Sequence, residues 1–488
     1  MLGFAPAMTD LLAGLEPSLL WKYFEGLARI PRGSGKEAAA MAWAEAEARA
    51  AGCEVERDAV GNLLARKKAT PGMEGRTPVA LQGHIDMVCE KDEATAHDFE
   101  KDPIQLVRDG DLLRARGTTL GADNGIGVAA GLAVLASKDL KHGPLEVLVT
   151  VDEETGLSGA NAIKPGWLRA KILLNLDSEA EHELTIGCAG GMDTVAVRKV
   201  TREPAPAGAK ALRIKVTGLK GGHSGIDIHL GRGNAIRVLA QVLDALAKHE
   251  PSIVSLKGGN KRNAIPREAS AVVLVAPARE AALRADAARL AGEWKAALGA
   301  IDPEVTVEVE PAEAGPVLSA ADAKAVVGLL LAGPNGVEAM SPAVPGLVQT
   351  STNLGVLDTR ADEVECTFLS RSAIDASKRA LAARIAAACR LAGFEARESG
   401  GYPGWKPEPG AGIVKLVAGV NEELFKVAPK VSACHAGLEC GIIGEKFPGM
   451  EMVSFGPDIK DAHTPREHVS IGSTERFWKL LVKVLERV

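Results

Sequence analysis

Histidine and carboxylate residues follow three apolar segments in the first half of this chain. The segment TPVALQGHI (77–85) carries His84 as its penultimate residue and is followed by Asp86. PLEVLVTV (144–151) is followed by the acids of DEE, which include Glu153 and Glu154, and KILLNLD (171–177) ends in Asp177. Imidazole and carboxylate groups are costly to bury alone, so their place at the ends of apolar strands calls for a compensating partner.

The three apolar segments alternate with helix-like segments, which is typical of a mainly parallel α/β sheet. Ligands of such sheets bind beyond the carboxyl ends of the strands, so we expect these side chains to converge there. Two further residues stand beside predicted helix starts, namely Asp123 in GADNGIG and His463 in KDAHTPREH. Imidazole with carboxylate suits Zn²⁺, with Mn²⁺ or Co²⁺ as alternatives, and this many ligands could hold two ions.

Local spacing is consistent with a metal site. His84 and Asp86 are two positions apart, so on an extended chain they point the same way and Asp86 can accept the second N–H of His84. Glu153 and Glu154 are adjacent, so their side chains diverge. One of the two can then bind a metal while the other acts as a general base on water.

Each residue also has a structural interpretation. Asp123 on its own is typical of a helix N-cap, and VDEETG is typical of a solvated turn. Asp177 could be the polar end of a strand, and His463 a histidine of a surface loop. The coincidence of two histidines and three carboxylates at loop positions favours the metal site.

Composition excludes several function classes. The 488 residues carry 57 basic and 63 acidic side chains, a net charge of −6 without a basic cluster, so nucleic acid is not an expected partner. The N-terminal segment lacks a basic region, and no uncharged run is long enough to span a bilayer, so we expect no membrane association. Met8 is an alternative start. The seven cysteines form no C-x-x-C pair, which indicates reduced thiols and a cytoplasmic protein.

The order of elements predicts one α/β domain interrupted by an inserted α+β domain. Residues 1–190 and 405–488 form the α/β domain, and residues 191–404 form the insertion. Residues 194–310 follow the β-α-β-β-α-β order of a ferredoxin-like unit, and residues 319–400 suggest a second, incomplete copy. Amphipathic helices are expected at 9–30 and 36–51, and GGYPGWKPEPG (400–410) is expected to be a linker.

Other motifs are weaker. GIGVAA (125–130) matches a dinucleotide-binding pattern, but no convincing strand precedes it, so we expect no such site. His223 lies in the glycine-rich GGHSGIDIHLGRGNA of the insertion. It could be structural, or it could act as an electrophile held by a rigid loop.

Taken together, these segments resemble the co-catalytic zinc aminopeptidase and dipeptidase clan, in particular its aminoacyl-histidine dipeptidase branch (Xaa-His or cytosolic nonspecific dipeptidases). The motifs that carry the resemblance extend from residue 81 to 472. They are LQGHIDMVCEK, GTTLGADNGIGVA, VTVDEETGLSGA, LNLDSE, GLKGGHSGIDIHLGRGNA, NAIPREA, HAGLECGII and GPDIKDAHTPREHVSI.

The resemblance implies a role for each matching residue. His84 and Asp177 would bind one Zn²⁺, Glu154 and His463 the other, and Asp123 would bridge both. Glu153 would be the general base, Asp86 would orient His84, and His223 would stabilise the oxyanion from a lid formed by the inserted domain. Residues expected at the substrate are Arg371, Asn260, Asn263 and His435, whereas Glu439 has no assigned role.

The resemblance therefore implies a zinc dipeptidase that cleaves unblocked dipeptides, including Xaa-His, by a water activated by two metals. A tripeptidase or an acyl-amino-acid deacylase would use the same metal ligands. A non-catalytic binding protein is a third alternative, and it predicts loss of Glu153 or Asp86, both of which are present. The doubled unit of the lid resembles relatives in which the second half replaces a dimer partner, so a monomer or a homodimer is expected.

Overall fold

The computed structural model describes residues 11–488, so the alternative start at Met8 lies outside the described part. The chain forms two compact units. Unit 1 consists of the described residues up to Gly187, together with Pro407–Ala433 and Leu438–Val488, and unit 2 consists of Cys188–Lys406 and Cys434–Gly437. The sequence-based boundaries after 190 and 404 did not anticipate that Cys434–Gly437 joins unit 2. This segment joins unit 2 because the backbone N–H of Ala189 donates to the carbonyls of Cys434 and Ala436.

Unit 1 is built on an eight-stranded mixed sheet with the order β1-β2-β6-β3-β7-β23-β8-β22. Its four central strands, β6, β3, β7 and β23, are parallel. The pairs β1–β2, β2–β6 and β8–β23 are antiparallel. The strands are β1 (Glu54–Arg57), β2 (Leu63–Lys67), β3 (Val79–His84), β6 (Leu145–Thr150), β7 (Ile172–Asn175), β8 (Glu183–Cys188), β22 (Lys430–Cys434) and β23 (Glu451–Ser454).

A smaller antiparallel sheet of unit 1 has the order β24-β25-β5-β4. Its strands are β4 (Leu106–Asp109), β5 (Leu112–Ala115), β24 (Ile459–Lys460) and β25 (His468–Ser470). The helices of unit 1 are α1 (Ser18–Ala28), α2 (Ala38–Ala50), α3 (Ala122–Ala136), α4 (Glu153–Gly156), α5 (Ser158–Ala162), α10 (Gly412–Phe425), α11 (Glu439–Lys446) and α12 (Ile471–Leu485).

The helices α1 and α2 pack on α3, which itself packs on β3 and β6, while α10 packs on β23 and α12. Helix α1 is shorter than the predicted 9–30, because Pro17 occupies its N-cap position and sets its start. Within residues 11–488, no helix combines the length and the apolar character that a membrane crossing requires.

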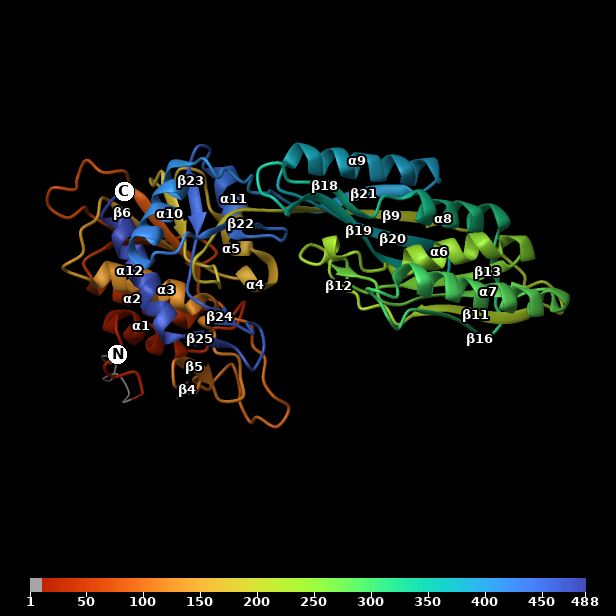
Figure 1. Ribbon diagram of the computed structural model, residues 1–488, viewed down its shortest axis with the longest axis horizontal. Coiled ribbons are helices and arrows are strands. Elements are labelled where there is room, and N and C mark those ends of the chain that lie inside the picture. The colour runs from red at the N-terminus through yellow and green to blue at the C-terminus, as the bar shows by residue number, and fades with distance from the viewer. Residues whose placement is uncertain (1–10) are drawn as a thin grey trace. The chain divides into compact units, whose positions relative to one another are not determined.

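Unit 2 contains a nine-stranded antiparallel sheet with the order β16-β11-β15-β13-β19-β20-β9-β21, and β18 pairs with β19 beside this path. Its helices α7, α6, α8 and α9 lie side by side against the sheet (Figure 1). The strands of this sheet are β9 (Gly190–Lys199), β11 (Lys210–Thr217), β13 (Ser252–Gly258), β15 (Ala269–Val275), β16 (Thr306–Pro311), β18 (Gly336–Met340), β19 (Val348–Thr359), β20 (Glu363–Ser372) and β21 (Glu395–Tyr402). The helices are α6 (Ala235–Leu246), α7 (Pro277–Leu298), α8 (Ala320–Ala332) and α9 (Asp375–Leu391).

The sheet order reveals two ferredoxin-like halves. The first half is β11-α6-β13-β15-α7-β16, as its sequence predicted. The second half, predicted to be incomplete, is complete, because its first strand is β9 and the elements α8, β19, β20, α9 and β21 follow after the first half. The first half is thus inserted into the second. For this reason the order of elements along the sequence did not indicate that β9 belongs to the second half. The end of β21 also extends into the predicted linker 400–410.

Two short strand pairs complete unit 2. Strand β10 (Arg202–Glu203) pairs with β17 (Val317–Leu318), and β12 (Gly222–His223) pairs with β14 (Ala264–Ile265). The second pair carries His223, whose backbone is thereby fixed to the NAIP segment of the sequence.

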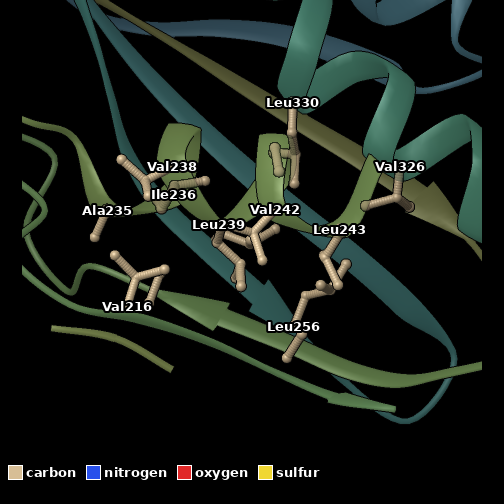
Figure 2. Packing of buried hydrophobic residues seen from close by; sticks show 14 of the residues in the cluster. Val216, Ala235, Ile236, Val238, Leu239, Val242, Leu243, Leu256, Val326 and Leu330 are labelled. Carbon is tan, nitrogen blue, oxygen red and sulfur yellow. The ribbon is translucent and has the colours of Figure 1, made fainter. Parts of the chain in front are cut away.

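The core of unit 2 forms around α6. Its buried face carries Leu239, Val242 and Leu243, which pack between the sheet and α8 (Figure 2). Residues of the sheet (Val216, Leu256) and of α8 (Val326, Leu330) complete this part of the core. Asn234 caps α6 by accepting hydrogen bonds from the N–H groups of Ile236 and Arg237, which fixes where the helix starts.

We expect Leu239→Ala to lower the free energy of unfolding by about 2–5 kcal/mol, because the fully buried Leu239 would leave a cavity. Urea-induced unfolding of the variant measures this loss. Gln241→Ala is the control, since Gln241 is exposed on the same helix. Equal losses in both variants would contradict the packing described here.

Candidate functional site

The carboxyl ends of β3, β6 and β7 meet at one edge of the unit 1 sheet. In the parallel register, His84 lies opposite Thr150 of β6, and Gln82 lies opposite Asn175 of β7. The loops that follow these strands carry Asp86, the Glu153–Glu154 pair and Asp177. The central position of β3 therefore places His84 between the two loops that supply the carboxylates.

Two imidazoles and three carboxylates lie in direct contact at this edge, and we call them the metal-site cluster. His84 Nε2 lies 3.2 Å from Asp123 Oδ1 and 3.3 Å from Asp177 Oδ1. His463 Nε2 lies 3.1 Å from both Asp123 Oδ2 and Glu154 Oε1. Asp123 thus contacts both histidines through different oxygens, which is the geometry of a bridging carboxylate.

The contacts of Asp123 decide between its two interpretations. The N-cap position of α3 is Gly121, and Asp123 has non-helical backbone angles within the first turn, φ −81° and ψ 112°. Asn124 Nδ2 donates to the carbonyl of Leu176 at 2.7 Å, which ties this turn to the end of β7. A side chain at Gly83 would collide with Asn124, so glycine is required for α3 to approach β3 this closely. Asp123 is therefore directed at the histidines and does not cap the helix.

Asp86 holds the loops on either side of His84. It is fully buried, and its Oδ1 lies 3.3 Å from His84 Nδ1. Its carboxylate accepts hydrogen bonds from the N–H groups of Glu153 and Glu154 and from the hydroxyl of Ser34. Burial alone would raise the pKa of Asp86, but the bonds and charge of His84 outweigh it and lower the pKa to about 2. Asp86 thus stays ionised and orients His84.

Glu153 and Glu154 play different structural parts, although they are adjacent in α4. The Glu154 carboxylate contacts His463 in the metal-site cluster. Within residues 11–488, the Glu153 carboxylate forms no hydrogen bond or ion pair. Burial, together with the charges of Asp177, Glu439 and Glu154, raises the pKa of Glu153 against the opposing effect of His84. An unengaged carboxylate with a raised pKa is suited to exchange a proton with water.

Glu467 and Arg32 support the backbone beside the metal-site cluster, and the sequence patterns did not indicate either residue. The Glu467 carboxylate accepts hydrogen bonds from four consecutive N–H groups, Leu120 to Asp123, at 2.7–3.2 Å. The Arg32 guanidinium donates to the carbonyls of Ile85, Asp86 and Gly121. Both side chains are 2% exposed, and together they fix the backbone beside His84 and Asp123. The only signal was their position, since Glu467 follows His463 in HTPREH and Arg32 lies in the breaker PRGSG.

Glu439, which had no assigned role, lies at the start of α11 below the strand ends. Its Oε2 accepts hydrogen bonds from Gln82 Nε2 at 2.6 Å and from Thr150 Oγ1 at 2.7 Å. Gln82 in turn accepts from Asn175. Burial raises the pKa of Glu439 to about 7, although the charge of His84 and the bond from Thr150 oppose this. The network links β3, β6 and β7 directly beneath the metal-site cluster.

The metal-site cluster fits a divalent cation. Donor atoms of His84, Asp123 and Glu154 lie within 4.8 Å of one another. Among the described residues, buried Glu154 Oε1 and Asp177 Oδ1 have no hydrogen-bond partner, although a histidine nitrogen is close to each. Burial raises the pKa of Asp177 to about 7, against the effect of His84, while the close contacts with the Asp123 and Glu154 carboxylates raise the pKa of His463 to about 11. Carboxylates that repel one another and contact histidine nitrogens match the ligand chemistry of Zn²⁺.

Unit 2 brings together other predicted residues around Arg371, which is 4% exposed on β20. Arg371 Nη1 donates to the hydroxyl of Tyr402 at 3.0 Å, and Nη2 lies 3.4 Å from His223 Nε2. Arg371 Nε also lies 3.5 Å from Ser224 Oγ. Tyr402 was missed, because it lies in the segment interpreted as a linker. Arg371 and His223 thus lie next to each other within unit 2.

His435 and the two asparagines occupy different places in unit 2. His435 is buried, with its Nε2 2.8 Å from Ser351 Oγ, and burial with the charge of Arg371 lowers its pKa to about 3. Asn260 lines a cavity of about 530 Å³ whose other residues include Lys215, Lys257 and Arg267. The side chain of Asn263 is exposed, and its carbonyl accepts from Ser224 N–H. Among the described residues, the hydrogen bonds of the Arg371 side chain are to Ser224, Tyr402 and His223 and include neither asparagine.

We expect Glu467→Ala to weaken metal binding about 10- to 100-fold, because the backbone that positions Asp123 would lose the acceptor for four N–H groups. Competition with a chromogenic chelator measures the affinity. Glu475→Gln is the control, since Glu475 forms only an exposed ion pair with Lys479. Unchanged affinity in Glu467→Ala would show that Asp123 does not need this support.

Known proteins share this fold and sequence over nearly the whole chain. Cytosol non-specific dipeptidase of Escherichia coli (strain K12) is 42% identical over 479 residues, covering 98% of this chain and 99% of that protein. The crystal structure of aminoacylhistidine dipeptidase from Vibrio alginolyticus superposes with a TM-score of 0.92 at 43% identity, covering 98% of each chain. Aminopeptidase PepT from Bacillus cereus shares the fold, with a TM-score of 0.57 at 17% identity over 97% of this chain and 98% of that one. Residues 80–487 match the peptidase family M20/M25/M40, and the chain belongs to this family.

Proposed function

We propose that this protein is a zinc-dependent dipeptidase that hydrolyses unblocked dipeptides, including Xaa-His. The observation that carries the proposal is the metal-site cluster, in which Asp123 contacts both His84 and His463. The two relatives that share more than 40% identity over nearly the full chain are named as dipeptidases, which supports the substrate class.

The proposed ligands divide around Asp123. His84 and Asp177 would hold one Zn²⁺, Glu154 and His463 would hold the second, and Asp123 would bridge them. The ions would supply Lewis-acid polarisation of the peptide carbonyl and lower the pKa of a water molecule. Mn²⁺ or Co²⁺ could replace Zn²⁺, because both accept imidazole and carboxylate ligands.

Glu153 is the proposed general base. Its carboxylate takes a proton from the attacking water and later returns it to the amine of the departing amino acid. Asp86 fixes the backbone of Glu153 through the hydrogen bond from Glu153 N–H, and it fixes the orientation of His84 through Nδ1. Asp86 is therefore a positioning residue for both groups.

The proposed contributions of unit 2 concern substrate binding and the oxyanion. His223 would donate a hydrogen bond to the oxyanion that forms from the peptide carbonyl. Arg371 would bind the substrate carboxylate through its planar guanidinium. The other proposed substrate residues are Asn260, Asn263 and His435. His435 has the most direct support, because its backbone packs against Gly225 in the loop that carries His223.

A single chain is proposed to be sufficient for activity, because both ferredoxin-like halves belong to one continuous sheet of unit 2. A cytoplasmic location is also proposed. It is supported by the name of the Escherichia coli relative and by the seven cysteines, which form no disulfide within residues 11–488.

We expect Glu153→Gln to lower kcat by about 100- to 10,000-fold while two Zn²⁺ ions stay bound, because the amide cannot accept the proton of water. The assay measures hydrolysis of Gly-His, β-Ala-His, Leu-Gly, tri-Ala and N-acetyl-Met by metal-stripped protein before and after addition of Zn²⁺. Glu93→Gln, at an exposed position of unit 1, is the control.

The substrate panel separates the alternatives. Zinc-dependent cleavage confined to the unblocked dipeptides would support the proposal. Cleavage of only tri-Ala or N-acetyl-Met would indicate a tripeptidase or an acyl-amino-acid deacylase, and wild-type activity in Glu153→Gln would refute the role of Glu153.

A further inference from the structure

The backbone of His223 is held on both sides. Gly222 and His223 pair with Ile265 and Ala264 in the short β12–β14 ladder. On the other side, the N–H of His223 donates to Asp227 Oδ2 at 2.9 Å. The position of the imidazole therefore depends on residues of the loop that follows it.

The ring nitrogens of His223 have different surroundings. Nδ1 accepts hydrogen bonds from the N–H groups of Gly225 at 3.2 Å and Ile226 at 3.0 Å. A nitrogen that accepts two hydrogen bonds carries no proton, so the proton of the neutral ring resides on Nε2. Burial and the charge of Arg371 lower the pKa of His223, with Asp227 opposing, so the ring is neutral at neutral pH.

This tautomer makes Nε2 a hydrogen-bond donor that lies beside the guanidinium of Arg371. His223 Nε2 and Arg371 Nη2 lie 3.4 Å apart, but both are donors and neither can accept from the other. Each of the two donors therefore requires an oxygen acceptor. A carboxylate or an oxyanion of the substrate supplies such an oxygen.

Asp227 and Arg232 form an ion pair around this loop. Arg232 Nη1 lies 3.2 Å from Asp227 Oδ2 and donates to the carbonyl of Gly221 at 2.7 Å. Gly222 has φ 138°, and a Cβ there would collide with both side chains, so the ion pair packs directly on the strand that presents His223. Each side chain of the pair is 24% exposed.

We propose that Asp227 and Arg232 are positioning residues that hold His223 as the neutral tautomer protonated at Nε2, so that Nε2 donates to the substrate oxyanion beside Arg371. The catalytic part of this inference rests on the proposed dipeptidase function. The tautomer itself does not, because it follows from contacts within unit 2.

The test uses full-length, zinc-loaded protein labelled with ¹⁵N in the histidine rings. Signals of His223 are assigned by their loss in His223→Gln. We expect a ring protonated at Nε2 alone in the wild type at neutral pH. In Asp227→Ala we expect this single-tautomer signature to be lost and kcat to fall about 100-fold, because a displaced donor no longer meets the reacting oxygen. Zinc content should remain unchanged.

Two further variants separate positioning from general damage to the fold. Asp227→Asn keeps an acceptor for the N–H of His223 but loses the ion pair with Arg232, so we expect it to restore most of the tautomer signature and part of kcat. Asp244→Ala, which removes an exposed carboxylate from α6 of the same unit, should behave as the wild type.

The inference is overturned if His223 is protonated at Nδ1 or at both nitrogens in the wild type. It is also overturned if Asp227→Ala leaves the ring signals unchanged. If the ring behaves as expected but no substrate of the panel is cleaved, the tautomer stands and the proposed dipeptidase function fails.

Discussion

Mutual repulsion of buried carboxylates is the constraint on which the organisation of unit 1 depends. Asp123, Glu154 and Asp177 converge at the ends of parallel strands, where burial limits the screening of their charges by water, and His84 and His463 contact them. Burial raises the pKa of Asp177 to about 7. Close contacts with the Asp123 and Glu154 carboxylates raise the pKa of His463 to about 11. Bound divalent cations would relieve this repulsion, and the surrounding contacts hold the three carboxylates and two histidines together.

The support for this cluster comes from residues that are distant in sequence. Arg32 joins the loop after β3 to the start of α3, and Glu467 joins that start to the loop that carries His463. Beneath them, Glu439 connects the side chains of Gln82 and Thr150 on neighbouring strands. Each of these groups is buried and forms several hydrogen bonds, so the cluster is preorganised by the fold.

The sequence was sufficient to predict what depends on local pattern. The apolar runs predicted β3, β6 and β7, and the rule that ligands bind at their carboxyl ends predicted where His84 and Asp177 would meet. The pattern could not reveal that β9 completes the second ferredoxin-like half, because an entire half intervenes before its partners. It also missed Glu467, Arg32 and Tyr402, whose roles arise from contacts across 31 to 347 sequence positions and leave no local signature.

We infer that Asp123 bridges two metal ions in unit 1. The most direct measurement is anomalous X-ray diffraction at the zinc absorption edge from crystals of zinc-loaded protein. We expect two anomalous peaks, one between His84 and Asp177 and the other between Glu154 and His463. Asp123 should contact both peaks. A single peak, or two peaks of which one does not contact Asp123, would show that Asp123 does not bridge two metal ions.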